Sequence, residues 1–233
     1  MENDAIRTES IVKEFGEVRA LNDVTIGIKR GELFFLLGGS GCGKTTLLRC
    51  IAGLEKPTSG SVFFDGEDVT DDTMYVRARK GIGYLPQEPS IFRGLTVEQN
   101  ILAILENLGL SRAARRNRVR ELLEELNLTP LAKSPAHTLS GGERRRAEIT
   151  RALVISPSFM LLDEPFAGID PIAVTDIQEI IFHLKARGIG VLITDHNVRE
   201  TLRITDRAYI VHDGAVFRSG TPAELARDED VKR

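Results

Sequence analysis

The run GGSGCGKT, from Gly38 to Thr45, carries the strongest chemical signal in the chain. It matches the pattern G-x-x-x-x-G-K-[ST] in full. Glycines let a backbone fold closely around phosphate oxygens, so that several N–H groups converge on them. A helix beginning at Lys44 would add the partial positive charge of its first turn. We therefore expect a nucleotide phosphate site, because a chance glycine-rich turn would lack the strand before it and the helix after it.

Single residues of this loop have separate expected tasks. Lys44 suits the β- and γ-phosphates of ATP, and the hydroxyl of Thr45 suits Mg²⁺. We interpret Cys42 as a small loop residue rather than a reactive thiol. The expected nucleotide-binding residues of this segment are Gly38, Gly39, Ser40, Gly41, Cys42, Gly43, Lys44, Thr45 and Thr46.

Two adjacent acids, Asp163 and Glu164, close the apolar run FMLL. Neighbouring side chains on a strand point in opposite directions, so the two acids are expected to have different tasks. We predict that Asp163 holds hydrated Mg²⁺ and that Glu164 polarises the attacking water. Two solvated acids at a strand end are the alternative, which four preceding apolar residues and Pro165 disfavour.

The pair Asp195-His196 ends another apolar run, GVLITD. A histidine at this point could contact the γ-phosphate and report its presence. Taken alone, a residue in this position is more often an ordinary surface histidine, so both interpretations stay open. The other three histidines, His137, His183 and His212, are assigned structural roles.

A second anion-binding helix start is predicted in the run LSGGE, Leu139 to Glu143. Ser140 stands where an N-cap is expected, and Gly141 and Gly142 follow it at the start of a helical pattern. One nucleotide needs only one anion-binding helix start, so the second would hold a nucleotide bound by another copy of the chain. An ordinary capped helix is the alternative, which spacing alone does not exclude.

The elements that position these motifs follow from apolar periodicity. Strand patterns occupy residues 6–37, ending in the continuous apolar run Leu33 to Leu37. Helical spacing follows the glycine loop as far as Gly53, and a turn is expected at Asp65-Gly66. Between Thr96 and Leu128 the periodicity is helical, and we predict a helical subdomain at approximately 90–155 within a single domain spanning 1–233. A further helix at about 172–187 and a capping box of Thr221 and Glu224 complete the pattern.

Composition restricts the class of protein. A chain of 233 residues with a net charge of −3 can bury a large core and lacks the basic stripe of nucleic-acid binders. Cys42 and Cys50 form no disulfide framework, which indicates a reducing cytoplasm. No apolar stretch approaches the ~20 residues that span a bilayer, and the N-terminus lacks signal-peptide features. We expect no direct membrane insertion, so that any membrane role comes through a partner.

Taken in order, the motifs GGSGCGKT, YLPQ, LSGGE, FMLLDEP, AGID and ITDH resemble the signature set of ATP-binding-cassette (ABC) ATPases over essentially the whole chain. The resemblance implies an α/β P-loop NTPase fold with a RecA-like core, an N-terminal antiparallel β subdomain and an inserted helical lobe. It also implies a head-to-tail homodimer that holds two ATP molecules, each between one phosphate loop and the LSGGE run of the other copy.

The resemblance also implies residue roles. Phe15 resembles the aromatic residue that stacks on adenine, and Gln87 the glutamine that links Mg²⁺ to the helical lobe. Glu164 resembles the catalytic base and His196 the switch histidine. By the same resemblance, the loop from Ala167 to Asp170 crosses the dimer interface, and Ser140, Gly141 and Gly142 act on the nucleotide of the other copy.

The second half of the chain, above all LSGGERRRAEI and GVLITDHNVRETL, is similar to the ATPases of lipopolysaccharide exporters. That likeness implies paired permease partners of the LptF and LptG kind, docking near Gln87 to Leu95, and a place on the cytoplasmic face of the inner membrane. Phe92 and Arg93 are candidates for the docking groove, with ordinary loop packing as the alternative.

Other interpretations come from separate features of the chain. Gly39, Ser40 and Cys42 resemble instead the loops of solute importers of the polyamine, sulfate or amino-acid type. A soluble ATPase acting on DNA is disfavoured, because the chain between Lys44 and Leu139 leaves no room for a long coiled coil. A nucleotide sensor without turnover would lack Glu164. The basic run Ser111 to Arg120 would face either anionic lipid or, balanced by nearby acids, solvent.

Overall fold

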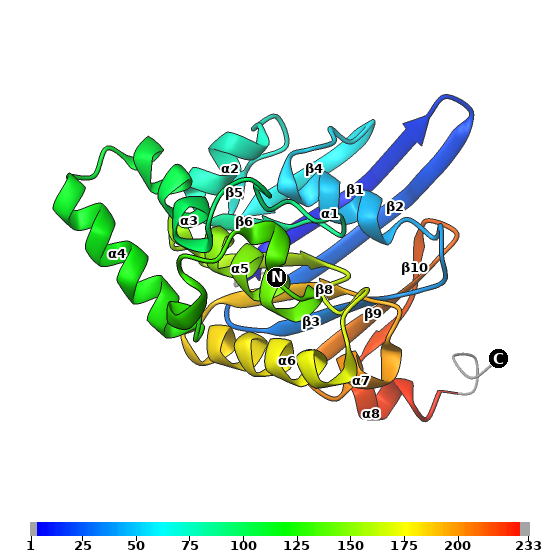
Figure 1. Ribbon diagram of the computed structural model, residues 1–233. Helices are drawn as coiled ribbons and strands as arrows, with labels where there is room; N and C mark the ends of the chain where they lie inside the picture. The colour runs from blue at the N-terminus through cyan, green and yellow to red at the C-terminus, as the bar shows by residue number, and fades with distance from the viewer. Residues whose placement is uncertain (1–3, 229–233) are drawn as a thin grey trace.

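The computed structural model describes residues 4–228, apart from the side chain of Arg199, and consists of two β-sheets with helices between and around them (Figure 1). The antiparallel sheet has the order β2-β1-β4-β5, with β1 (Asp4–Phe15), β2 (Val18–Lys29), β4 (Ser59–Phe64) and β5 (Glu67–Asp68). The second sheet has the order β10-β9-β3-β8-β7-β6, with β3 (Leu33–Leu37), β6 (Ile82–Leu85), β7 (Phe159–Asp163), β8 (Gly190–Thr194), β9 (Arg207–His212) and β10 (Ala215–Gly220). All neighbours in the second sheet are parallel except the edge pair β9–β10.

The described residues form eight α-helices, of which the last follows the final strand: α1 (Lys44–Ala52), α2 (Met74–Lys80), α3 (Val97–Leu105), α4 (Arg112–Glu125), α5 (Gly141–Ala152), α6 (Pro171–Ala186), α7 (Val198–Leu202) and α8 (Pro222–Leu225). Four 3-10 turns lie at Glu106–Leu108, Thr129–Leu131, Ala136–Thr138 and Leu153–Ile155. Helix α1 lies between the two sheets, α6 covers the opposite face of the parallel sheet, and α3 to α5 gather at one end (Figure 1).

The central strands are buried on both faces because helices cover both. Along β7, Phe159 and Leu161 join the cluster that contains α1 and the antiparallel sheet. Met160 and Leu162 join the cluster formed with α3 to α6. This alternation follows from the two-residue period of a strand. The same alternation determines which side of the sheet a residue at the end of the strand faces.

The fold class expected from the sequence is confirmed. The strand at Leu33–Leu37 has the expected bounds, and α1 ends at Gly53 in a left-handed conformation (φ 78°). Asp65 (φ 51°) and Gly66 (φ 83°) both have the positive φ that a tight hairpin turn needs. All helices and 3-10 turns from 97 to 155 fit the expected helical subdomain, whose boundaries stay a prediction.

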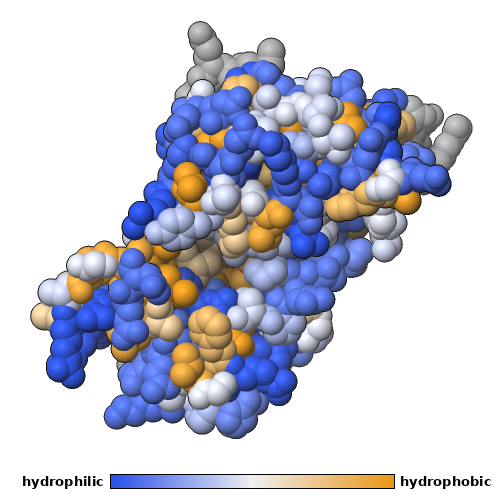
Figure 2. All heavy atoms as spheres, turned by 90° about the horizontal axis from the view of Figure 1, so that it is seen from above, coloured by the Kyte–Doolittle hydropathy of each residue, from blue (hydrophilic) through white to orange (hydrophobic). Residues whose placement is uncertain are grey.

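The surface is mainly hydrophilic, with apolar side chains in separate small patches on the face seen in Figure 2. On the basic helix α4, Arg118 pairs with Glu121 at 3.3 Å and Arg115 with Glu106 at 3.7 Å. Both pairs support the interpretation of a solvated face. Within residues 4–228, no helix has the length and apolar character needed to cross a membrane.

Arg77 stabilises the junction between α1 and α2, although the sequence does not mark it as special. Its side chain is 1% exposed. The guanidinium donates to the carbonyls of Cys50 (2.7 Å) and Ile51 (2.8 Å) at the end of α1, and to those of Asp72 and Thr70 (both 3.0 Å). These bonds satisfy carbonyls that a helix end leaves without donors. Arg77 thereby fixes the helix that begins with Lys44.

We predict that replacing Arg77 by Met lowers the free energy of unfolding by about 3 kcal/mol, because several buried carbonyl oxygens lose their donors. Urea unfolding followed by circular dichroism measures the change. Arg79→Met is the matched control, since Arg79 is exposed on the same helix, and it should alter stability by about 0.5 kcal/mol or less. Equal effects of the two substitutions would contradict the role given to Arg77.

Candidate functional site

The glycine loop lies between the end of β3 and the start of α1. Its last residue, Gly43, is the N-cap of α1 with φ 105°, and no side chain caps the helix. A Cβ at Gly43 would lie 2.5 Å from the carbonyl oxygen of Ala20 in β2, so a larger residue does not fit. The first N–H groups of α1 are therefore left for an anion, as a helix N-terminus with no capping side chain allows.

Lys44 lies against its own loop. Its side chain is 5% exposed, and its ammonium group donates to the carbonyls of Gly38 (2.7 Å) and Gly39 (2.8 Å). The Sγ of Cys42 lies 3.7 Å from the same nitrogen. Two carbonyl oxygens of its own loop thus surround the ammonium group.

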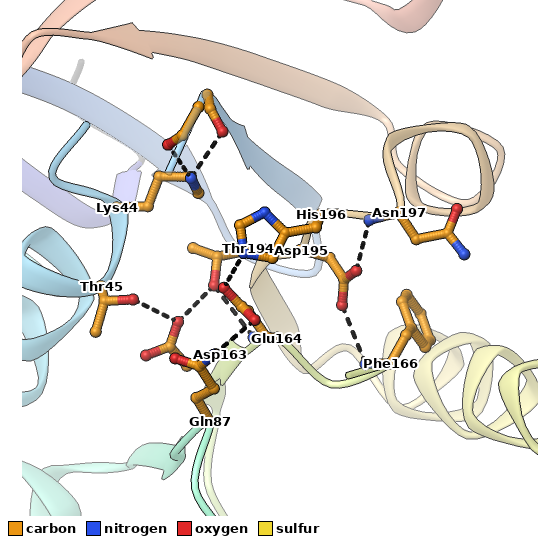
Figure 3. A network of polar contacts seen from close by, with 12 residues as sticks. Lys44, Thr45, Gln87, Asp163, Glu164, Phe166, Thr194, Asp195, His196 and Asn197 are labelled. Atoms are coloured by element: carbon orange, nitrogen blue, oxygen red, sulfur yellow. Dashed lines mark hydrogen bonds and ion pairs between the residues drawn. The ribbon is translucent and has the colours of Figure 1, made fainter. Parts of the chain in front are cut away.

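Asp163 is held by hydroxyl groups from three other elements (Figure 3 shows those of Thr45 and Thr194). Its Oδ1 accepts from Thr194 (2.6 Å) and Thr45 (3.1 Å), and its Oδ2 accepts from Tyr84 (3.4 Å). Burial, with the Asp163 charge adding to it, raises the pKa of Tyr84 to about 12, so the phenol stays a proton donor. Asp163 is fully buried and has no ion pair among the described residues.

Glu164 directly follows the last residue of β7 and has different partners from Asp163. Its backbone is left-handed (φ 46°), which is uncommon for a residue with a Cβ. Its N–H donates to the carbonyl of Thr194 (2.8 Å). One carboxylate oxygen lies 2.7 Å from Nε2 of His196, and the other accepts from the Gln87 amide at 2.8 Å (Figure 3). The chain thus brings Gln87, Glu164 and His196 together, although they come from three separate segments.

Asp195 holds the segment that follows these acids. Its carboxylate accepts from the backbone N–H groups of Phe166 (3.0 Å) and Asn197 (2.7 Å) (Figure 3). Two consecutive residues at the end of β8 therefore bind the turn after β7. Thr194 accepts from the N–H of Glu164, and Asp195 accepts from the N–H of Phe166.

Arg145, in the middle of α5, joins this turn to the helical region. The buried guanidinium donates to the carbonyls of Pro86 (2.8 Å), Asp163 (2.9 Å) and Glu164 (3.2 Å). It also pairs with Glu148 at 3.3 Å. Burial lowers the pKa of Arg145, and the negative charge of Glu148 opposes this shift. The other oxygen of Glu148 accepts from the N–H groups of Ser90 (2.8 Å) and Ile91 (3.2 Å).

The run at Ser140 begins α5, as predicted. Ser140 is its N-cap and forms a capping box with Glu143, whose carboxylate accepts from the Ser140 N–H at 2.8 Å. These bonds lower the pKa of Glu143. A Cβ at Gly141 would lie 3.2 Å from the carbonyl of Gly168, so the start of α5 packs against the AGID loop.

Phe15 lies at the end of β1 with 47% of its surface exposed, and the Lys13 ammonium lies 4.8 Å from its ring centroid. It belongs to the β1–β2 hairpin, whose second strand contacts Gly43 through Ala20. Neither Phe15 nor the Ser140–Gly142 segment shares a hydrogen bond with Lys44 or the two acids among the described residues. One copy of the chain thus gathers the loop, acids, glutamine and histidine, and leaves the other predicted contacts apart.

Sequence reasoning assigned no supporting role to the residues that hold the functional side chains in place. These residues are Tyr84, Arg145, Glu148, Thr194 and Asp195. The alternation of β8 places Thr194 on a definite face, but only the pairing of β8 with β7 shows that this face is next to Asp163. No local pattern distinguishes Arg145 from the arginines on either side of it.

This fold and this arrangement of phosphate loop and paired acids define a P-loop ATPase. A family model described as ABC transporter matches residues 21–167. The chain is 56% identical to a probable ABC transporter ATP-binding protein of Azorhizobium caulinodans, covering 96% of this chain and 79% of that one. It is 51% identical to the lipopolysaccharide export system ATP-binding protein LptB of Acidithiobacillus ferridurans, covering 99% and 96% of the two chains. The LptB of Escherichia coli K12 is 48% identical, with coverage of 98% and 95%.

Among solved structures, an ABC transporter cassette in its ADP conformation matches with a TM-score of 0.89 and 32% identity, covering 98% of this chain and 97% of that one. The chain therefore belongs to the ABC transporter ATP-binding family. It is an ATPase and the nucleotide-binding subunit of a transporter.

We predict that Arg145→Met destabilises the protein by about 3–5 kcal/mol, because it leaves Glu148 buried without its cation. Glu148→Gln should also be strongly destabilising, since the Arg145 charge then has no counter-ion. The double variant should lose less than the sum of the two, with an interaction of about 1–3 kcal/mol. Urea unfolding of all four proteins measures this cycle. Strict additivity would show that the ion pair contributes nothing of its own.

Proposed function

We propose that this chain powers a lipopolysaccharide exporter by hydrolysing Mg²⁺–ATP between two copies of itself. The observation that carries the proposal is the full-length similarity to LptB proteins, at 48–51% identity, combined with a complete set of site residues. The catalytic pair in this proposal is Glu164 with His196.

The donor set around Asp163 fits Mg²⁺. A buried carboxylate without a cation is unfavourable, and Asp163 has only neutral hydroxyl donors within hydrogen-bond distance. The hydroxyl oxygen of Thr45 lies 3.1 Å from Oδ1 of Asp163, so these two oxygen atoms face the same small volume. Oxygen ligands of this kind are those that Mg²⁺ prefers. Thr45 and Asp163 would hold the ion, directly or through its water molecules, and the ion would neutralise phosphate charge.

The residues of the loop then bind the nucleotide. The N–H groups at the start of α1 and the Lys44 ammonium would receive phosphate oxygens in place of the loop carbonyls. Phe15, on the exposed end of its hairpin, offers a ring face to the adenine. Gln87 contacts Glu164 and not Asp163, so any metal contact of Gln87 requires its amide to move.

Glu164 is placed to accept a proton from water. His196 contacts one of its carboxylate oxygens and the Gln87 amide contacts the other. A carboxylate oxygen has two lone pairs, so each oxygen keeps one with which to accept a proton from water. The side chain of His196 is 56% exposed and that of Glu164 is 9% exposed, so the histidine is the more accessible of the two.

A second copy would complete the site. Ser140, Gly141 and Gly142 lie at a helix start that contacts neither the loop nor the acids of the same chain by a hydrogen bond. A related cassette, 30% identical with a TM-score of 0.83, has been solved as a dimer with ADP and phosphate after hydrolysis. In a head-to-tail pair, this helix start would face the phosphates bound by the other copy.

We expect Glu164→Gln to retain ATP binding and to slow hydrolysis by at least about 100-fold, because the amide is no base. The variant should also accumulate as an ATP-bound dimer, which size-exclusion chromatography with light scattering detects. Glu179→Gln is the control, since Glu179 is exposed on α6, and it should hydrolyse ATP normally. Normal turnover by Glu164→Gln would show that another group is the base.

A groove of about 320 Å³ suits the permease subunit. Met74 and Ala78 of α2, Tyr84 of β6, and Phe92 line it with other residues. Phe92 is 49% exposed, and the buried amide of Asn100 binds its backbone on both sides, accepting from its N–H at 2.8 Å and donating to its carbonyl at 3.1 Å. An exposed ring on a fixed backbone is a suitable anchor for a partner helix.

The groove is physically connected to the acids. Arg151 donates to the Ser90 carbonyl at 2.6 Å, and its guanidinium lies 5.3 Å from the Phe92 ring centroid. The neighbouring N–H groups of Ser90 and Ile91 bind Glu148, which pairs with Arg145. Arg145 then holds the carbonyls of the catalytic turn. These contacts form a continuous path from the groove to the backbone of Glu164.

We predict that Phe92→Ala reduces co-purification with the permease subunits at least about tenfold, because a central aromatic anchor is typically worth 2 kcal/mol or more. ATP hydrolysis by the isolated protein should stay normal. Phe217→Ala removes a ring of similar exposure from β10 and serves as the control. Normal permease recovery with Phe92→Ala would place the docking surface elsewhere.

The proposed partners define where the protein works. A permease in the inner membrane would hold it at the cytoplasmic face, as a peripheral subunit without nucleic-acid contacts. A solute importer is the second candidate, favoured by Gly39, Ser40 and Cys42 in the phosphate loop. Identification of the co-purified permease distinguishes the two: paired LptF- and LptG-like subunits support export, and a permease that binds a periplasmic solute receptor supports import.

A further inference from the structure

We propose that Thr194 is a positioning residue for the metal: its hydroxyl fixes the carboxylate of Asp163 in the orientation that Mg²⁺ requires. The inference rests on the proposed metal site at Asp163 and Thr45. It concerns the last residue of β8, which Asp195 and His196 directly follow in the chain.

Strand register places Thr194 beside Asp163. The two residues are direct partners in the parallel pairing of β7 and β8, as Leu161 and Leu192 are two positions earlier. Leu161 and Leu192 both face the cluster that contains α1. Because side chains alternate with a period of two, Asp163 and Thr194 must face the same side, toward Thr45. Figure 3 shows the three side chains converging there.

The hydrogen bonds of the Thr194 hydroxyl leave it one orientation. A hydroxyl has one proton to donate and two lone pairs to accept with. Its proton is directed at Oδ1 of Asp163 over 2.6 Å, the shortest of the three hydroxyl contacts to this carboxylate. A lone pair accepts from the backbone N–H of Glu164 at 3.2 Å. The same oxygen therefore sets the position of one acid relative to the backbone of the other.

Thr194 also differs from the other two donors to Asp163, Thr45 and Tyr84, in how firmly its hydroxyl is held. The Thr45 oxygen is a proposed ligand of the metal, so its environment changes when the ion binds. The Tyr84 contact is long, at 3.4 Å, and reaches the other carboxylate oxygen. Thr194 is fully buried and β-branched in a central strand, which restricts its side chain to few rotamers. It is the donor that holds Oδ1 both before and after metal binding.

The choice of Thr over Val at this position is explained by the hydroxyl alone, since the two residues have nearly the same shape. Residues that orient a metal ligand without touching the metal typically contribute 10- to 100-fold in metal affinity. Removing the hydroxyl would let the Asp163 carboxylate rotate, and Oδ1 would retain only Thr45 among its donors. The backbone bond from Glu164 to the Thr194 carbonyl would remain.

The test measures metal binding directly. Mn²⁺ is titrated into the full chain saturated with a non-hydrolysable ATP analogue, and electron paramagnetic resonance separates protein-bound Mn²⁺ from Mn²⁺ held by free nucleotide. Thr194→Val should weaken Mn²⁺ binding at least about tenfold, and Thr194→Ser should stay within about threefold of the unmodified protein. Nucleotide binding in the presence of EDTA should be equal in all three. Hydrolysis by Thr194→Val should show a lower kcat and need more Mg²⁺ for half-maximal rate.

Two control variants make the result specific. Thr8→Val removes another fully buried strand hydroxyl, which donates to Val24 and accepts from Ile26 far from the acids; it should lose comparable stability and bind Mn²⁺ normally. Asp163→Asn should abolish Mn²⁺ binding by the protein. If Thr194→Val does not fold, Thr194→Ala provides the same comparison without the hydroxyl.

The possible results distinguish the role of the Thr194 hydroxyl from the existence of the metal site at Asp163. Normal Mn²⁺ affinity in Thr194→Val, or equal losses in the Val and Ser variants, would overturn the role of the hydroxyl. Loss of nucleotide binding in EDTA would show general damage to the site and would overturn it as well. If Asp163→Asn binds Mn²⁺ normally, the metal site itself is wrong and the proposed function needs another metal acid.

Discussion

The structure depends on one constraint at the end of β7: two adjacent acids must be held by different partners within one site (Figure 3). Asp163 stays in the strand and faces α1, where it meets neutral hydroxyl groups. Glu164 turns into the left-handed region, which costs a residue with a Cβ about 1–2 kcal/mol relative to the right-handed form. The surroundings must supply that energy, and they do so with backbone hydrogen bonds. The separate positions of the acids allow separate roles.

Backbone carbonyls at this turn are held chiefly by Arg145. A strand end without a partner would leave carbonyls buried and unbonded, which is costly in a packed interior. One guanidinium satisfies several of them and is itself balanced by Glu148. Because a guanidinium is planar and rigid, it also fixes the distances between the segments it joins. The same contacts that stabilise the turn therefore link it to the surface groove at Ser90.

Much of the fold could be predicted from local pattern. The apolar run at Leu33–Leu37, the turn at Asp65-Gly66 and the helical periodicity after Thr96 reflect short-range preferences that a sequence displays directly. The phosphate loop is predictable for the same reason, since its glycines and Lys44 are consecutive. Gln87 was assigned through family resemblance, whereas Glu164 and His196 were first predicted from their places after apolar runs. Their mutual contacts were not expected from spacing, because each follows a different strand.

The sequence by itself determined the elements, the phosphate loop and the faces of each strand, because these depend on residues a few positions apart. Only the tertiary structure decided that Thr194 stands beside Asp163 and that Arg145 holds the turn. Strand pairing is a long-range choice, made by burial of whole sheet faces and not by any local pattern. A threonine in β8 and an arginine in α5 become supports of the site only when that packing brings them to the end of β7.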